Sequence, residues 1–166
     1  MSDCRNQAYI EAPVEVVWEL IADVERHPEW WPRVVEIECE ELGEGCNYRQ
    51  VTRTPFGNDE MDLQIESMQE PEEFLVRCVN TGTFVRFGLT SAQGGTFVDG
   101  RMGMEPNGLA YKVFDATAGR IYFRSWLAAS LEAMAEAAKK RAQEMGDPGF
   151  EPGTSSLSET RSNRLS

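Results

Sequence analysis

Basic residues other than arginine are scarce in this chain. The lysines are Lys112, Lys139 and Lys140, the one histidine is His27, and 16 lysines and arginines face 28 aspartates and glutamates. The resulting formal net charge of −12 repels phosphate backbones and anionic bilayer surfaces. We therefore expect neither nucleic acid nor an acidic membrane surface as a partner.

Metal-binding cysteine pairs and long apolar runs are also lacking. The four cysteines, Cys4, Cys39, Cys46 and Cys78, include no C-x-x-C spacing, so we expect reduced free thiols and no metal site. No apolar run approaches the roughly 20 residues that span a bilayer, and no signal-peptide pattern is found. We expect a cytoplasmic protein with no integral membrane segment and no cofactor.

The composition suits one folded domain with a tail. A chain of 166 residues that is 41% hydrophobic can bury a core, and we assign residues 1–146 to it. Residues 147–166 are rich in Pro, Gly and Ser without periodicity, so we expect disorder there. Their Gly-Phe-Glu-Pro stretch can be encoded by GGGTTCGAACCC, which resembles the T-arm of a transfer-RNA gene. This suggests that the tail is translated read-through into such a gene.

The N-terminal part changes from a strand to a helix and then to a corner. Residues 3–11 predict a short strand, and Val14, Val17, Trp18 and Ile21 then follow helical spacing. We expect Pro28 to end any helix and the two tryptophans of "HPEWWP" to lie on a short turn.

From residue 34 to residue 104 the hydrophobic period is two. Val35, Ile37 and Cys39 share one face of the first of these strands, and Met61, Leu63 and Ile65 alternate with polar residues further on. The connections have hairpin length, so seven strands, counting the first, should form an antiparallel sheet.

A long helix should close the chain. The stretch "GRIYFRSWLAASLEAMAEAAKKRAQEM" begins at residue 119, and 109–118 predicts a bent helical lead-in. Residues at helical spacing give it an apolar stripe: Phe123, Leu127, Ser130, Leu131, Met134 and Ala138. Strands followed by a long helix predict the α+β class.

The segment "IEAPVEVVWELIADVERHPEWWPRV", residues 10–34, resembles the start of the START-like, Bet v 1-like (SRPBCC) superfamily. It is most similar to the polyketide cyclase/dehydrase and coenzyme Q-binding branch, and the likeness extends in element order to about residue 145. The resemblance implies a START-like ligand-binding domain over 1–146 with a helix-grip fold. In that fold a seven-stranded curved antiparallel sheet, with two short helices after its first strand, wraps around a long C-terminal helix and encloses a cavity.

Strand parity predicts the lining of that cavity. Charged residues should face solvent, so their neighbours face inward. The predicted ligand-binding residues are Trp31, Tyr48, Gln50, Thr52, Met61, Leu63, Phe87, Met102, Met104, Trp126 and Ser130. This surface is mainly apolar with one stripe of hydroxyl and amide groups, which suits an apolar ligand with one or two oxygens. A core filled by these side chains is the alternative.

Catalytic groups are not expected on the inward faces, because no carboxylate pair, Ser/His/Asp set or Cys/His set falls there. We expect His27 to be a solvated turn histidine and Glu105 to be solvated. Tyr48 could polarise a carbonyl or could lie at a cavity rim. For the tryptophan pair, we expect Trp30 to anchor the corner against Trp18 and the first helix, and Trp31 to stand at the cavity mouth.

Three functional hypotheses follow. The first is a carrier or binder of a hydrophobic small molecule such as a lipid, quinone or polyketide-like compound. The second is a polyketide cyclase/dehydratase-like enzyme that shapes a reactive chain. The third is a protein-interaction module of the co-chaperone type. The sequence leaves the ligand, the oligomeric state and the question of catalysis open.

Overall fold

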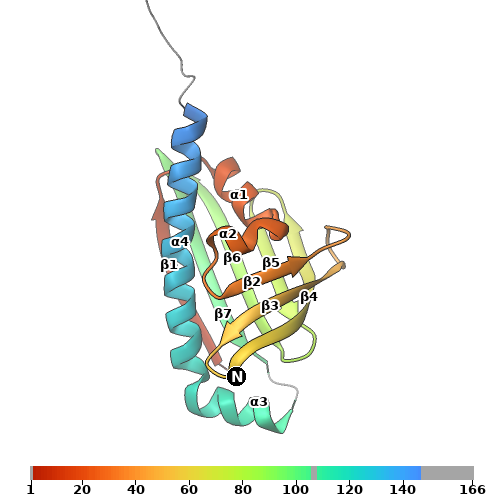
Figure 1. Cartoon of the computed structure of the whole chain (residues 1–166). Helices are drawn as coiled ribbons and strands as arrows, with labels where there is room; N and C mark the ends of the chain where they lie inside the picture. The colour runs from red at the N-terminus through yellow and green to blue at the C-terminus, as the bar shows by residue number, and fades with distance from the viewer. Residues whose placement is uncertain (1, 106–107, 147–166) are drawn as a thin grey trace, which may run out of the picture.

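The strands of the chain form one antiparallel sheet. The computed structural model describes residues 2–105 and 108–146, so the predicted tail at 147–166 lies outside the described residues. The strands are β1 (Ser2–Ile10), β2 (Val34–Glu38), β3 (Asn47–Thr54), β4 (Gly57–Gln69), β5 (Glu73–Cys78), β6 (Thr83–Ala92) and β7 (Gly95–Met104). The seven-stranded sheet has the order β1-β7-β6-β5-β4-β3-β2 (Figure 1).

Helices occupy two places in this order of strands. Between β1 and β2 lie α1 (Val14–Ala22), the 3-10 turn η1 (Val24–Arg26) and α2 (His27–Trp30). After β7 come α3 (Leu109–Phe114), the π-helical turn η2 (Asp115–Gly119) and the long α4 (Arg120–Gly146). Figure 1 shows α4 running along the sheet beside β1, with α3 at the end of the molecule away from α1. The predicted α+β class and helix-grip arrangement are confirmed.

The buried face of α4 is the one that the helical spacing predicts. All six residues of the predicted stripe are buried: Phe123, Leu127, Ser130, Leu131, Met134 and Ala138. Gly100 of β7 lets the helix approach the sheet, because a Cβ there would lie 2.9 Å from Cδ1 of Leu127. The leucine side chain therefore occupies space that any larger residue at position 100 would need.

Strand parity also holds on the concave face of the sheet, except at its β2 edge. Tyr48, Gln50 and Thr52 are buried while their neighbours on β3 are more exposed. On β2, Val34 is buried and Val35 is exposed, the reverse of the prediction at these two positions, whereas Ile37 of the predicted face packs against the core. The register shifts between Val34 and Glu36, and such an irregularity changes which residues face the core.

The "HPEWWP" corner differs from the prediction, because Pro28 does not end a helix. It lies in the first turn of α2, where the missing N–H of proline costs no hydrogen bond. The backbone N–H of Trp31 donates to the carbonyl of His27 at 2.8 Å and completes this turn. The corner is therefore helical, and the chain becomes extended only at Trp31.

Candidate functional site

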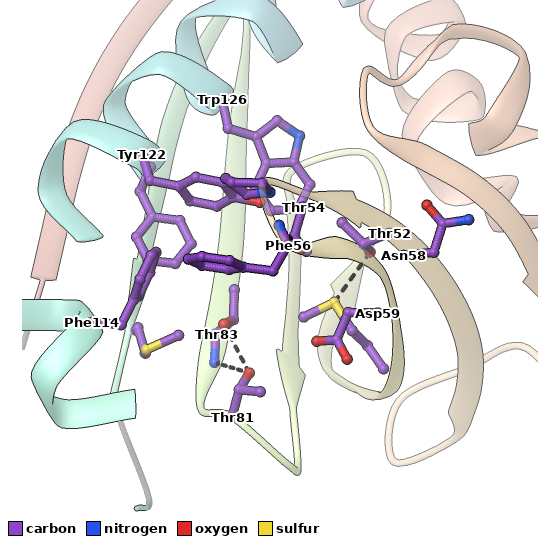
Figure 2. Close-up of a pocket in the computed structure, with 14 residues that line it drawn as sticks. Thr52, Thr54, Phe56, Asn58, Asp59, Thr81, Thr83, Phe114, Tyr122 and Trp126 are labelled. Carbon is purple, nitrogen blue, oxygen red and sulfur yellow. Dashed lines mark hydrogen bonds between the residues drawn. The ribbon is translucent and has the colours of Figure 1, made fainter. Parts of the chain in front are cut away.

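A pocket of about 340 Å³ opens between the concave face of the sheet and the helices α3 and α4 (Figure 2). Its strand side is polar at the entrance and its helix side is aromatic. The lining residues are Thr52, Thr54, Pro55, Phe56, Asn58, Asp59, Met61, Thr81, Thr83, Met104, Phe114, Tyr122, Phe123 and Trp126. The entrance lies at the β3–β4 turn and at α3, the end of the molecule away from α1 (Figure 1).

A second, much smaller cavity of about 30 Å³ lies deeper under the sheet. Its walls are formed by Trp31, Tyr48, Gln50, Met61, Leu63, Val76, Thr83, Phe84, Val85, Met102 and Trp126. Met61, Thr83 and Trp126 line both spaces, so they separate the outer pocket from the inner cavity. The inner cavity has room for about one water molecule or for the tip of a ligand.

The predicted ligand-binding residues divide between these two spaces. Seven of them surround the inner cavity: Trp31, Tyr48, Gln50, Met61, Leu63, Met102 and Trp126. Thr52 and Met104 line only the outer pocket. Phe87 and Ser130 line neither space, and both instead contact the indole of Trp31. The deep part of the predicted surface is thus largely filled by side chains, and the open part lies nearer the surface.

The tryptophan corner is tied to α4 by hydrogen bonds. The indole N–H of Trp31 donates to Oγ of Ser130 at 2.8 Å, and that hydroxyl donates to the carbonyl of Trp126 at 2.6 Å. The indole N–H of Trp126 in turn donates to the carbonyl of Pro32 at 2.8 Å. These bonds hold α4 against the corner and fix the inner wall of the cavity.

The prediction that Trp30 anchors the corner and Trp31 stands at the cavity mouth is wrong. Trp31 is only 5% exposed and lies deep in the core, whereas Trp30 is only partly buried. The two indoles are stacked, with ring centroids 5.3 Å apart and planes at 15°. They do not point in opposite directions because Trp30 ends a helical turn and is not part of an extended segment.

His27 is buried, not solvated as predicted. It is 0% exposed, and its Nε2 donates to the carbonyl of Ile21 at 2.7 Å. Burial lowers its pKa to about 4, so the ring is neutral at pH 7. It packs edge-on against Trp30 and Trp31 and lines neither cavity. Its place in the structure is that of a core residue beneath the corner.

Two threonines place a hydroxyl group at the boundary of the two spaces. The hydroxyls of Thr81 and Thr83 share a hydrogen bond of 2.8 Å, and the backbone N–H of Thr83 donates to Oγ1 of Thr81 (Figure 2). Either hydroxyl can be the donor in their shared bond, so the Thr83 hydroxyl keeps a proton or a lone pair for one further hydrogen bond. That capacity is available to an oxygen of a ligand, which can donate or accept.

A second hydroxyl group lies across the pocket on β3. Oγ1 of Thr52 accepts from the side-chain amide of Gln50 at 2.8 Å and donates to the sulfur of Met61 at 3.2 Å. A thioether is a weak acceptor, so the Thr52 proton can pass to a stronger acceptor at little cost. Thr52 and Thr83 therefore place hydroxyl groups with remaining hydrogen-bonding capacity on the pocket wall.

Tyr48 lies at the inner cavity and not at a rim, where one hypothesis placed it. It is 3% exposed, and none of the described residues supplies a hydrogen-bond partner for its hydroxyl. Burial raises the pKa of Tyr48 well above its ordinary value, with Cys39 adding a smaller effect in the same direction. The hydroxyl is therefore protonated and can donate to a group that enters the inner cavity.

The helix side of the pocket is an aromatic cluster. Tyr122 contacts Phe114, Phe123 and Trp126 with nearly perpendicular rings at 5.2–5.8 Å. The guanidinium of Arg33 lies 5.1 Å from the Tyr122 ring, and burial raises the tyrosine pKa while this cation acts against the shift. Phe114 and Tyr122 were not predicted from the sequence, whereas Trp126 was among the predicted ligand-binding residues and Phe123 was placed on the buried stripe of α4.

Arg33 is held in an unusual backbone conformation beside this cluster. Its φ of 75° lies in the left-handed region, which residues with a side chain adopt at a cost. The carbonyl of Arg33 accepts from the backbone N–H of Arg53 at 2.7 Å, so pairing with β3 compensates the strain. This geometry turns the chain from the corner into β2.

The turn between β3 and β4 covers the entrance. Phe56 is 89% exposed at its tip, and Figure 2 shows its ring on the same side of the pocket as Phe114. The hydroxyl of Thr54 donates to the carbonyl of Gly57 and accepts from the N–H of Phe56, which fixes the turn. An apolar residue in the "TPFG" turn was the sequence signal that could have indicated this entrance.

A metal-binding group and a membrane-spanning helix are not found in the described part of the chain. No three His, Cys, Asp or Glu side chains there are grouped so that they could hold a metal ion. None of the helices in residues 2–105 and 108–146 is both long and apolar enough to cross a membrane.

Comparison with known proteins agrees with this architecture. A family model described as polyketide cyclase/dehydrase and lipid transport matches residues 1–139. A START superfamily protein from Mycobacterium smegmatis has a similar structure, with 13% identity, a TM-score of 0.66 and coverage of 87% of this chain and 99% of that chain. A comparison with curated proteins finds no match.

Two aromatase/cyclase structures are also similar. The di-domain ARO/CYC protein StfQ, from the steffimycin biosynthetic pathway, has 17% identity and a TM-score of 0.67. The match covers 87% of this chain and 52% of StfQ, about half of the di-domain protein. The Zhui aromatase/cyclase from Streptomyces sp. R1128 has 14% identity, a TM-score of 0.59 and coverage of 90% of this chain and 98% of that chain. At these identities the likeness shows the fold alone.

Proposed function

We propose that the protein binds and carries a small, largely apolar molecule. The premise is that the chain belongs to the polyketide cyclase/dehydrase and lipid transport family. The observation that carries this proposal is the pocket of about 340 Å³ with an aromatic helix side and few polar groups. Its volume lies in the range of small-molecule sites, which are mostly apolar with a few placed polar groups.

The apolar body of the ligand would lie between the sheet and the aromatic cluster. Met61 and Met104 form the floor, and Phe114, Phe123 and Trp126 form the helix wall. Methionine side chains adapt to ligands of different shape, so this floor favours a class of compounds over one rigid molecule. The exposed Phe56 would cover the ligand at the entrance.

The oxygens of the ligand would meet the hydroxyl groups at the inner end of the pocket. Thr83 can make one further hydrogen bond, and Thr52 has only a sulfur acceptor for its own proton. A ligand with one carbonyl or hydroxyl at its inner end satisfies one or both groups. A narrow tip that reaches the inner cavity would also meet the protonated hydroxyl of Tyr48.

The chemistry of the lining supports carriage over catalysis. Asp59 is the one carboxylate among the described lining residues of the outer pocket, and it is exposed at the entrance. No histidine or cysteine lines either space within the described residues. A general base and a nucleophile within hydrogen-bond reach of each other are therefore not assembled there.

A second candidate is a cyclase-like enzyme that acts by shaping a reactive chain. Tyr48 favours it, because a protonated hydroxyl without a partner can polarise a substrate carbonyl at the inner cavity. The two functions differ in what Tyr48→Phe does. Loss of product formation with unchanged binding of the apolar body would favour the enzyme, whereas binding without any product formation by the wild type would favour the carrier.

Binding to this pocket is tested with an uncharged apolar fluorophore, N-phenyl-1-naphthylamine. Asn58 is exposed and lines the entrance, so Asn58→Trp should obstruct the pocket without disturbing the core. The matched control is Gln93→Trp, in the exposed turn between β6 and β7. We expect the wild type and the control to bind alike and Asn58→Trp to bind at least about tenfold more weakly, or about 1.4 kcal/mol. Equal binding by all three would contradict the assignment of the pocket.

Identification of the natural ligand needs a separate measurement. Native mass spectrometry of the protein purified from its own host would detect a bound molecule by its added mass. We expect a small compound with few oxygens, retained by the wild type and by Gln93→Trp and reduced in Asn58→Trp. Recovery of a highly charged compound in this pocket would contradict the proposal.

A further inference from the structure

Arginine side chains gather in an open pocket at the β1 edge of the sheet, beside the start of α4. This pocket of about 510 Å³ lies between β1, β7 and the first turns of α4. Its described lining consists of Asp3, Cys4, Arg5, Arg101, Arg120 and Arg124. We call these four arginines, Arg5, Arg101, Arg120 and Arg124, the arginine cluster.

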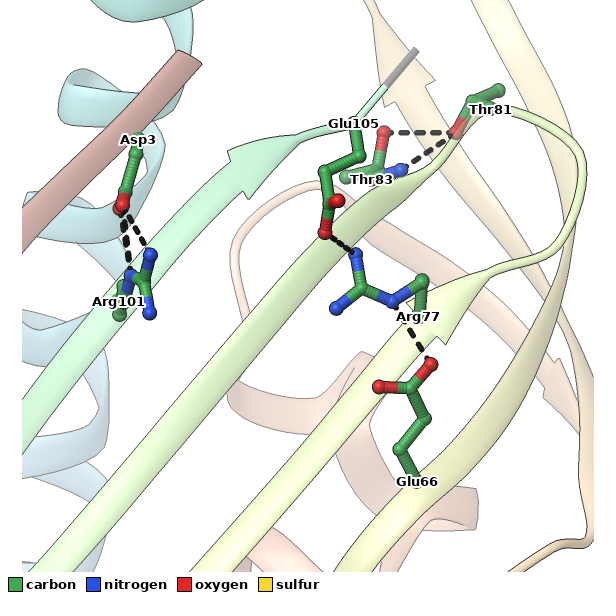
Figure 3. Close-up of polar contacts among 7 residues, drawn as sticks. All are labelled: Asp3, Glu66, Arg77, Thr81, Thr83, Arg101 and Glu105. Carbon is green, nitrogen blue, oxygen red and sulfur yellow. Dashed lines mark hydrogen bonds and ion pairs between the residues drawn. The ribbon is translucent and has the colours of Figure 1, made fainter. Parts of the chain in front are cut away.

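Among the described residues that line this pocket, Asp3 is the one carboxylate. Asp3 accepts from Nε of Arg101 with both oxygens at 2.9 Å (Figure 3). The hydrogen bond from Arg101 is the main cause that lowers the pKa of Asp3, and Arg5 and Arg120 lower it further. Within the described residues no carboxylate pairs with Arg5, Arg120 or Arg124. The pocket therefore holds an excess of positive charge.

The fold brings these like charges together from two elements. Arg5 lies directly opposite Arg101 in the register of β1 and β7. Arg120 and Arg124 are four residues apart on α4, so they are neighbours on one face of the helix. Like charges in either arrangement destabilise the folded protein. An anion in the pocket would remove this repulsion.

Three other arginines of the sheet are neutralised by their neighbours. Arg77 pairs with Glu66 and Glu105, as Figure 3 shows, and Arg49 pairs with three glutamates. Arg86 lies beside Arg101 in the sheet and pairs with Glu73. The chain has 28 acidic residues against 16 basic ones, so unpaired arginines do not result from a shortage of acid.

We propose that the arginine cluster is a binding site for a phosphate group. The planar guanidinium of arginine presents paired N–H donors that match phosphate oxygens, and it keeps its charge at any physiological pH. Arg5, Arg120 and Arg124 approach the pocket from a strand and from a helix, so they can contact different oxygens of one group. This site is separate from the apolar pocket and does not depend on the proposed function.

The net charge of −12 does not prevent such binding. At physiological ionic strength, charges are screened over about 8 Å, so the arginines next to the ligand outweigh distant carboxylates. Cys4 does not add a reactive thiolate to the pocket. Its thiol donates to the carbonyl of Met102, and burial raises its pKa.

Inorganic phosphate is the first probe, titrated into the full-length protein by calorimetry at constant ionic strength with sodium chloride as the balancing salt. The test variant is Arg120→Gln combined with Arg124→Gln. The control is Arg53→Gln, an exposed arginine of β3 outside the cluster. We expect phosphate to bind the wild type and the control alike and the double variant at least tenfold more weakly. The same double variant should melt no lower than the wild type without phosphate, because it loses like-charge repulsion.

A second arm distinguishes a soluble phosphate compound from a lipid headgroup. Vesicles of phosphatidylcholine, with and without phosphatidic acid, are sedimented with the wild type, the double variant and the Arg53→Gln control. Cosedimentation that needs both phosphatidic acid and the two arginines identifies the headgroup as the source. Binding of free phosphate without cosedimentation identifies a soluble ligand. If neither probe binds, or if the double variant binds both as the wild type does, the phosphate site is refuted.

Discussion

Replacing Trp31 by alanine should destabilise the protein far more than replacing Trp30. Trp31 is 5% exposed, packs on Phe87 and His27, and donates a hydrogen bond to Ser130. A buried aromatic of this size removes about 150–250 Å² from water, which at about 25 cal/mol per Å² corresponds to about 4–6 kcal/mol. Large-to-small changes of buried aromatics cost about 3–5 kcal/mol in practice, so we expect a loss of about 4 kcal/mol.

Trp30→Ala is the matched comparison. Trp30 is only partly buried, and its indole N–H is buried without a partner in the described structure. Removing that unsatisfied donor offsets part of the lost packing, so we expect a loss of about 1–2 kcal/mol. For a domain of this size 1 kcal/mol shifts the melting temperature by about 2–4 °C, so the two variants should differ by several degrees.

Urea unfolding with the slope compared between variants is the assay, because a constant slope shows that only stability changed. Trp31→Ala should also enlarge the inner cavity that Trp31 lines, so the variant should admit a larger apolar probe than the wild type. If Trp30→Ala is as damaging as Trp31→Ala, Trp30 is the anchor of the corner after all, and the packing described for Trp31 is wrong.

Three further predictions concern the core. Burial lowers the His27 pKa to about 4, so between about pH 6.5 and pH 4 the unfolded chain binds a proton at His27 and the folded chain does not. The free energy of unfolding should therefore fall by about 3 kcal/mol as the pH falls through this window. Urea unfolding of His27→Phe at several pH values should lack this part of the pH dependence. Leu131→Asp, on the buried stripe of α4, should cost about 3–5 kcal/mol or prevent folding, whereas the exposed Glu132→Lys should leave the melting temperature nearly unchanged; equal effects would mean that the buried face is misassigned. Tyr48→Phe removes a hydroxyl that makes no hydrogen bond to the described residues, so thermal melts should show nearly unchanged stability, and a clear loss would reveal a structural bond to that hydroxyl.

The parts of the fold that could be predicted are those set by periodicity within one element. Alternation on β3 and β4 places their buried residues correctly, and helical spacing gives the buried stripe of α4. In these elements the period of the apolar residues directly sets which face is buried against the core. Val35 fails only because an irregular register on β2 reverses the alternation locally.

The corner could not be predicted because local rules there allow two outcomes. Proline ends a helix when it would lie in the interior and favours one when it lies in the first turn. The burial of Trp31 depends on α4, which meets the corner about a hundred residues later through Ser130, and His27 packs in turn against the Trp31 ring. A contact at that separation leaves no mark in the local sequence. The expectation of a solvated histidine and an exposed Trp31 therefore failed for the same reason.

The entrance of the pocket was missed because it depends on how α3 and the start of α4 lie over the β3–β4 turn. Phe56, Phe114 and Tyr122 come from three separate elements, and no periodicity links them. The predicted residues Met61 and Trp126 are nevertheless shared by the outer pocket and the inner cavity. Strand parity thus predicted that Met61 faces inward, while the position of the opening required the three-dimensional structure.

The first turns of α4 separate two pockets with opposite chemistry. Arg120 and Arg124 line the pocket of the arginine cluster, while Phe123 and Trp126 line the apolar pocket. Substitutions on the two faces should therefore act independently. The Arg120→Gln, Arg124→Gln double variant should keep wild-type binding of N-phenyl-1-naphthylamine, and Asn58→Trp should keep wild-type binding of phosphate. Combining all three changes should weaken each interaction only as much as its own variant does. A loss of apolar binding in the arginine variant would mean that the two pockets belong to one site for an amphipathic ligand.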